Sequence, residues 1–180
     1  MRKILMIFLA YFAFSVAGKA QKDNPADDLQ KILAEFPELQ SGKVYNTDYL
    51  LATLDKNVEP NLTWRVLFEK NQFMKVGEFS AHPIGYYKRN DKVVVVLYAN
   101  GEKGNAIAHF IDVQTYNLKS GKRISQISNI GAFGGTGSAG CALEISEDKK
   151  IVGFATTTLV STDKIVVEIS DKGIIKEPKK

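Results

Sequence analysis

Residues 84–130 read IGYYKRNDKVVVVLYANGEKGNAIAHFIDVQTYNLKSGKRISQISNI, and this pattern indicates the class of fold. Runs rich in β-branched and aromatic residues alternate with short polar turns, which is typical of strands joined in hairpins. Residues 89–91 and 119–122 are two of these turns, and Gly121 lies where a hairpin turn needs a positive φ. Residues 93–97 are apolar on both faces, which predicts a strand in the centre of its sheet.

The same alternation continues to the C-terminus. Residues 141–145 and 151–158 flank a polar turn, and residues 165–170 and 174–176 flank another. No long helical segment separates the expected strands, which excludes a parallel sheet built from βαβ units. We therefore expect a mainly β domain with a minor helical part. Its antiparallel meander would form a curled sheet, a partly open barrel or a propeller-like stack.

The N-terminal part of the domain begins with a helix. Asn24 is suited to the N-cap and Pro25 to the first helical position. The apolar residues that follow recur at helical spacing, so we expect them to pack on the sheet: Leu29, Ile32, Leu33 and Phe36. Residues 44–55 allow a second short helix. Residues 62–69 alternate around Trp64, which favours a strand that residues 75–80 could pair with.

Residues 1–20 have the three regions of a cleavable secretory signal. Arg2 and Lys3 are followed by the uncharged apolar run 4–16, and small residues stand before Gln21. The apolar run is shorter than the roughly 20 residues that span a bilayer. We expect cleavage before Gln21, a single domain over residues 21–180, and a periplasmic or secreted protein without stable membrane insertion.

Composition narrows the possible functions further. The formal net charge is +4, but three of the cationic residues lie in the expected signal and others in the short basic tail, residues 172–180. The folded part is therefore close to neutral, and nucleic-acid binding, which needs a basic stripe on a folded face, is not expected. Cys141 is the single cysteine, so the chain has no internal disulfide.

The glycine-rich segment 131–140, GAFGGTGSAG, is the most distinctive feature of the chain. Its last six residues match G-x-G-x-x-G, but a strand pattern follows where a dinucleotide site needs a helix. An aromatic side chain presented on a loop is a common binding anchor, and small neighbours let another backbone approach. We therefore predict that this loop binds a protein partner through Ala132, Phe133, Gly134, Gly135, Thr136, Gly137 and Ser138.

Catalytic and metal sites have weaker support in the sequence. A hydrolase would pair Ser138 or Cys141 as nucleophile with His82 or His109 as base, oriented by Asp112. Two separated histidines and one cysteine give no metal-binding spacing, so we expect neither a metal nor a cofactor.

These observations predict a small exported β-domain that binds a protein partner in the cell envelope or outside the cell, such as an inhibitor or immunity protein, and not an enzyme. The alternatives are a barrel-type carrier of a small apolar ligand and, with less support, the Ser/Cys hydrolase.

Overall fold

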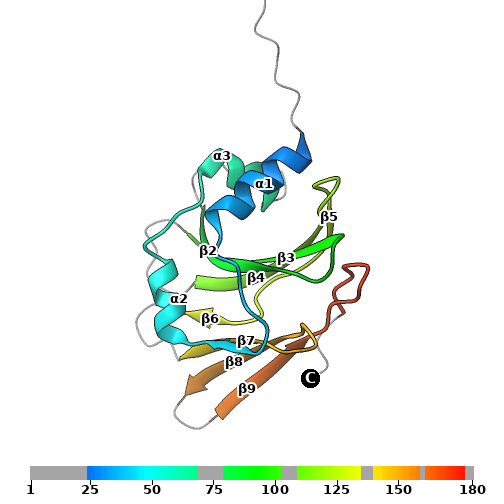
Figure 1. Cartoon of the computed structure of the whole chain (residues 1–180). Coiled ribbons are helices and arrows are strands. Elements are labelled where there is room, and N and C mark those ends of the chain that lie inside the picture. Colours follow the sequence, from blue (N-terminus) through cyan, green and yellow to red (C-terminus); the bar gives the residue numbers. More distant parts are fainter. Residues whose placement is uncertain (1–23, 69–78, 103–108, 135–139, 159–160, 177–180) are drawn as a thin grey trace, which may run out of the picture.

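The computed structural model describes residues 24–68, 79–102, 109–134, 140–158 and 161–176. Within these ranges the chain forms three helices and nine strands (Figure 1). The elements are α1 (Pro25–Glu35), β1 (Lys43–Tyr45), α2 (Thr47–Thr53), α3 (Pro60–Val66), β2 (Phe79–Lys88), β3 (Val93–Glu102), β4 (His109–Asn117), β5 (Arg123–Ile127), β6 (Ala132–Phe133), β7 (Cys141–Ile145), β8 (Ile151–Thr158) and β9 (Ser161–Val167).

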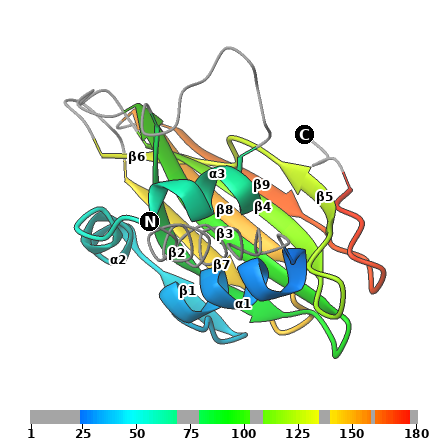
Figure 2. The same cartoon turned by 90° about the horizontal axis from the view of Figure 1, so that it is seen from above.

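The strands form two antiparallel sheets. The first has the order β2-β3-β4-β5, with β6 also paired to β4, and the second has the order β1-β7-β8-β9. Helices α1 and α3 lie over the outer face of the first sheet, and the second sheet packs beneath it (Figures 1 and 2). The expected mainly β, hairpin-built class is confirmed. The described strands nevertheless form two stacked sheets, and they do not close into a barrel.

The position of strand β3 between two hydrophobic cores explains why its sequence is apolar on both faces. Val95 and Leu97 belong to the core between the two sheets, whereas Val94 and Val96 belong to a second core beneath α1 and α3. All four side chains are fully buried. The predicted central strand is confirmed, since β3 lies between β2 and β4.

Helix α1 follows the expected signals. The side chain of Asn24 accepts a hydrogen bond from the backbone N–H of Ala26, and Pro25 is the first helical residue. Leu29 and Ile32 are fully buried in the core that α1 shares with β3. The possible second helix over residues 44–55 is observed as α2.

The strand expected over residues 62–69 is wrong, because residues 60–66 form helix α3. Pro60 occupies the first turn, and the carboxylate of Glu59 accepts hydrogen bonds from the backbone N–H groups of Asn61 and Leu62. Capping of these two donors favours the helix over the extended form. The proposed pairing of residues 75–80 lies largely outside the described residues, and β2 begins at Phe79.

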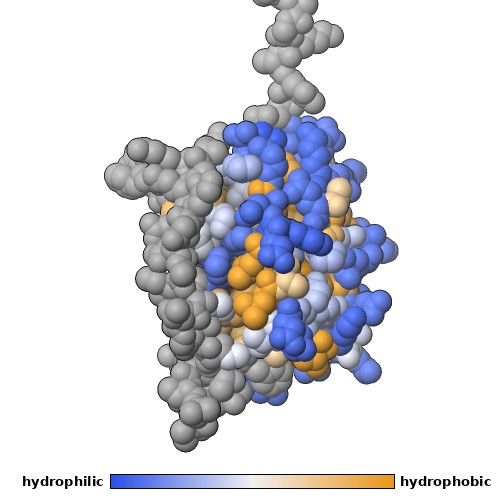
Figure 3. Space-filling view, turned by 90° about the vertical axis from the view of Figure 1, so that its left-hand side faces the viewer, coloured by the Kyte–Doolittle hydropathy of each residue, from blue (hydrophilic) through white to orange (hydrophobic). Residues whose placement is uncertain are grey.

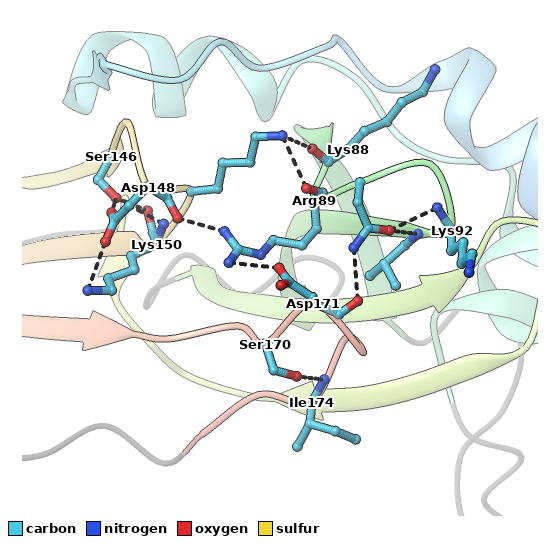
Figure 4. Close-up of polar contacts among 12 residues, drawn as sticks. Lys88, Arg89, Lys92, Ser146, Asp148, Lys150, Ser170, Asp171 and Ile174 are labelled. Atoms are coloured by element: carbon cyan, nitrogen blue, oxygen red, sulfur yellow. Dashed lines mark hydrogen bonds and ion pairs between the residues drawn. The ribbon is translucent and has the colours of Figure 1, made fainter.

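A polar network fastens the two sheets together at the β2–β3 turn (Figure 4). The guanidinium of Arg89 donates to the backbone carbonyl of Asp148 at 2.6 Å and pairs with the carboxylate of Asp171 at 3.1 Å. Lys149, in the β7–β8 turn, donates from Nζ to the carbonyl of Lys88 at 3.0 Å. Three predicted turns thus meet and hold one end of the domain.

On the coloured part of the surface seen from the side of α2, apolar areas lie among largely hydrophilic residues (Figure 3). On α2, Leu51 is 41% exposed. Single exposed apolar side chains are normal in folded proteins, so Leu51 alone does not indicate a binding site. In the described ranges, every helix is too short or too polar to cross a bilayer.

Candidate functional site

The first half of the glycine-rich segment is part of the first sheet. Ala132 and Phe133 form β6, whose register on β4 pairs Phe110 with Ala132 and His109 with Phe133. Just before β6, Ile111 exchanges backbone hydrogen bonds with Ile130 and Gly131. These pairings fix the segment up to Phe133 against β4.

The expectation that Phe133 is presented to a partner is wrong. Its side chain is fully buried in the core between the sheets, because pairing with His109 directs it to the inner face of β4. Ala132 and Gly134 are half-buried, and Gly134 has a φ of 74°. The other predicted contact residues, Gly135, Thr136, Gly137 and Ser138, lie outside the described residues, so their role in binding stays a prediction.

Cys141 is placed as a core residue and not as a nucleophile. Its side chain is 1% exposed, and burial raises the pKa of its thiol to about 11. A thiol becomes nucleophilic only as the thiolate, which this environment disfavours. Ser138, the other nucleophile considered, lies outside the described residues.

We expect Cys141 to react with a thiol reagent such as dithionitrobenzoate at pH 8 about 100-fold more slowly in the native protein than in urea. The physical reason is the rise of the thiol pKa from 9.0 to about 11, which lowers the thiolate population by about that factor. Stopped-flow absorbance measures both rates. A native rate close to the unfolded rate would contradict the buried position.

Asp112 cannot orient His109. The two residues are three positions apart on β4, and side chains alternate between the faces of a strand, so they point to opposite sides of the sheet. Asp112 instead accepts hydrogen bonds from the Asn100 side chain at 2.5 Å and from the backbone N–H of Asn129 at 2.9 Å. Burial raises the pKa of its carboxyl group.

The two histidines do meet. Their rings are 5.1 Å apart between centroids and edge to face, at 79°. His109 lies opposite Gly101 on β3, and a methyl group on Gly101 would stand only 2.7 Å from the His109 ring. Because Gly101 has no side chain, the His109 ring can occupy this space and contact the His82 ring.

His82 also contacts a serine that the sequence interpretation missed. Its Nε2 lies 2.9 Å from Ser80 Oγ, and its Nδ1 lies 2.8 Å from the carbonyl oxygen of Lys56. Ser80 and His82 are two positions apart on β2, which puts both side chains on one face. The strand expected from the sequence ended at residue 80, so His82 was not expected on the same strand face as Ser80.

A separate surface pocket of about 350 Å³ opens between α1, α3 and the β4–β5 hairpin. Its lining includes the aromatic residues Phe68 and Tyr116. Among the described residues, its charged lining comprises Arg65, Lys122, Arg123 and Asp28.

The charges at one side of this pocket are held in place. Arg65 donates to both carboxylate oxygens of Asp28, from Nε at 2.9 Å and from Nη2 at 3.2 Å. This hydrogen bonding holds the pKa of Asp28 below its usual range, against the opposing effect of burial. A two-point contact of this kind fixes the guanidinium plane before any ligand arrives.

The β4–β5 turn reaches the pocket through a close backbone contact. Gly121 has a φ of 67°, and a methyl group on it would lie 2.1 Å from the carbonyl group of Pro25. Only glycine allows the turn to lie this close to α1, and the contact brings Lys122 and Arg123 beside Arg65.

The pocket was not predicted from the sequence. Arg65 was expected on a strand, whereas Lys122 and Arg123 appeared as ordinary polar residues of a hairpin. No group of three or more histidine, cysteine or acidic side chains arranged to hold a metal ion occurs in the described part of the chain. Neither a protein-family model, nor a curated protein, nor a solved structure matches this chain.

Proposed function

We propose that this chain is an exported binding protein that receives an acidic group of a protein partner in the pocket between α1, α3 and the β4–β5 hairpin. The observation that carries the proposal is the gathering of three cationic side chains at one pocket, Arg65, Lys122 and Arg123, with Arg65 fixed by Asp28. Arginine suits this role because its planar fork matches a carboxylate.

The size and chemistry of the pocket fit part of a protein better than a large ligand. About 350 Å³ lies at the lower end of the range for ligand sites and suits one or two side chains. Phe68, which is half-buried, offers aromatic surface beside the cations. An acidic segment that contains an apolar residue would use both features, with the carboxylate fixing orientation and the apolar residue excluding water.

The barrel-type carrier has less support. Such a carrier holds its ligand inside a closed sheet. The described strands instead form two sheets, and their facing side chains pack into one core that includes Leu97, Ile111 and Phe133. We therefore favour recognition at the surface.

Reversing the pocket charges should abolish partner capture. We would immobilise the wild-type protein and the double variant Lys122→Glu/Arg123→Glu, and identify by mass spectrometry what each retains from envelope extract of the source organism. We expect one stoichiometric protein on the wild type and its loss from the variant. The loss of two charge-assisted hydrogen bonds should weaken affinity about 10- to 100-fold.

Two further baits separate the pocket from other causes. The variant Lys92→Glu/Lys119→Glu has the same net charge as the pocket variant, and both of its lysines are exposed outside the pocket lining. A deletion of residues 135–138 tests the glycine-rich segment separately. Equal capture by the two charge-reversal variants would overturn the pocket proposal, whereas loss with the deletion alone would assign binding to the segment.

A defined probe checks the chemistry of the pocket without the partner. Fluorescence anisotropy would compare a labelled Glu-Phe-Glu peptide with its Gln-Phe-Gln counterpart on wild-type protein. We expect binding of the acidic peptide only, weakening as salt is raised, since exposed charges are screened at high ionic strength.

A further inference from the structure

We propose that Ser80 is an activated nucleophile with His82 as its general base, able to accept an acyl group from a short, uncharged carboxylic ester. This activity uses neither the pocket nor the protein partner of the proposed function. It also differs from the hydrolase considered from the sequence, which relied on Ser138 or Cys141.

The hydrogen bonds around His82 assign its tautomer. The carbonyl oxygen of Lys56 can only accept a hydrogen bond, so Nδ1 of His82, 2.8 Å away, carries the ring proton. In the neutral imidazole the other nitrogen, Nε2, then has a lone pair, and Ser80 Oγ lies 2.9 Å from it. A serine hydroxyl that donates to a histidine, which in turn donates to a fixed acceptor, is the arrangement of an activated serine.

The acceptor behind His82 is itself held in place. The segment that contains Lys56 is tied back to β2, because the backbone N–H of Val58 donates to the carbonyl of Ala81 at 2.9 Å. The N–H of Lys56 donates to the carbonyl of Thr53 at 3.1 Å. Rotation of the imidazole would break its hydrogen bond to the fixed carbonyl of Lys56. This hydrogen bond therefore holds the ring in one orientation, as a general base requires.

The hydroxyl of Ser80 has a second acceptor, the carbonyl of Gly101 at 3.3 Å. The contact with Nε2 of His82 is the shorter of the two, so the hydroxyl proton lies toward the base. Ser80 is half-buried whereas His82 is 6% exposed, so the hydroxyl is the more accessible member of the pair.

His109 supports the pair by remaining neutral. Burial, with a smaller contribution from His82, holds the pKa of His109 below its usual range. A neutral ring edge to face with His82 adds no positive charge to oppose protonation of His82 during the reaction. Gly134 lies close to both His109 and Leu54, and these described neighbours offer apolar surface for a short neutral acyl group.

The reaction is balanced with water alone. Ser80 Oγ bonds to the ester carbonyl carbon while its proton passes to Nε2 of His82. The carbon–oxygen bond to the alcohol then breaks, and the alcohol leaves with that proton. Water next adds to the acyl-serine and gives a proton to Nε2, and the acid leaves as Ser80 regains its hydrogen. One ester and one water become one acid and one alcohol.

The test labels the purified protein with a fluorophosphonate probe and maps the adduct by mass spectrometry. We expect stoichiometric modification of Ser80, none in Ser80→Ala, and unchanged labelling in Ser120→Ala, the matched control at an exposed serine of the β4–β5 turn. His82→Gln should slow labelling at least about 100-fold, within the contribution of a positioned base.

Turnover of p-nitrophenyl acetate provides the second measurement. Circular dichroism of each variant separates loss of fold from loss of chemistry, and Ser80→Ala, at a half-buried site, is expected to fold. No adduct at Ser80, an adduct at Ser120 at a similar rate, or ester turnover retained by folded Ser80→Ala would overturn the proposal.

Discussion

Replacing Phe133 by alanine is expected to lower the free energy of unfolding by about 3–5 kcal/mol, the usual cost of removing a buried phenylalanine. The side chain is fully buried between the two sheets, and its ring centroid lies 6.2 Å from that of His109. Truncation would leave a cavity bounded by two sheets that the Arg89 network holds together, so collapse around it would be limited. Urea denaturation followed by circular dichroism measures the change.

Phe110→Ala is the matched control for this prediction. Phe110 is also a phenylalanine of the same sheet, paired with Ala132, but it is 40% exposed. Its truncation should cost about 1–2 kcal/mol, since about two fifths of its surface remains in water and no enclosed cavity is left. Similar losses in the two variants would contradict the assignment of Phe133 to the core. Such a result would instead support the prediction that Phe133 is exposed and binds a partner.

Replacing Gly121 by alanine should be the most damaging small substitution at the pocket. Its φ of 67° costs an alanine about 1 kcal/mol or more, and the added methyl group would lie 2.1 Å from the backbone carbonyl of Pro25. Backbone atoms cannot move aside as a flexible side chain can, so α1 must separate from the hairpin. We expect a loss of about 3 kcal/mol or more in stability and a corresponding loss of capture by the pocket.

The variant Gly42→Ala separates the cost of the positive φ from the cost of the steric clash. Gly42 has a similar φ of 75°, but a methyl group there would meet only the Glu147 side chain, at 3.8 Å. This variant should therefore lose about 1 kcal/mol, the dihedral cost alone. Thermal unfolding of both variants makes the comparison. Equal losses would show that the contact between the hairpin and α1 is not as close as described.

Local signals in the sequence predicted most elements but not their assembly. Asn24 and Pro25 opened α1 as expected, and residues 141–145 and 151–158 were placed correctly as strands. Hairpins are specified by neighbouring residues. The second sheet is completed at one edge by β1, only three residues long, which pairs with β7 about 100 residues later in the chain. No local pattern encodes such a pairing.

The candidate sites were less predictable for related reasons. Phe133 was misjudged because its glycine-rich neighbours suggest a loop, whereas pairing with His109 buries it. The helix at residues 60–66 was misread because Leu62, Trp64 and Val66 alternate, although Glu59 and Pro60 were helix signals. The pocket depends on that helix, since Arg65 reaches Asp28 from it. One wrong element therefore concealed the charge cluster.

The position of β1 has a consequence for the order of folding. In a chain that emerges N-terminus first, Tyr45 cannot pair with Leu143 until residue 143 of 180 has been synthesised. The first sheet with α1 and α3 can assemble earlier, and it would then expose Val95, Leu97 and Ile111 to water. Such distant pairings fold slowly, and transient apolar surface favours aggregation. The time taken to complete the C-terminal strands thus sets how long the nascent chain is vulnerable.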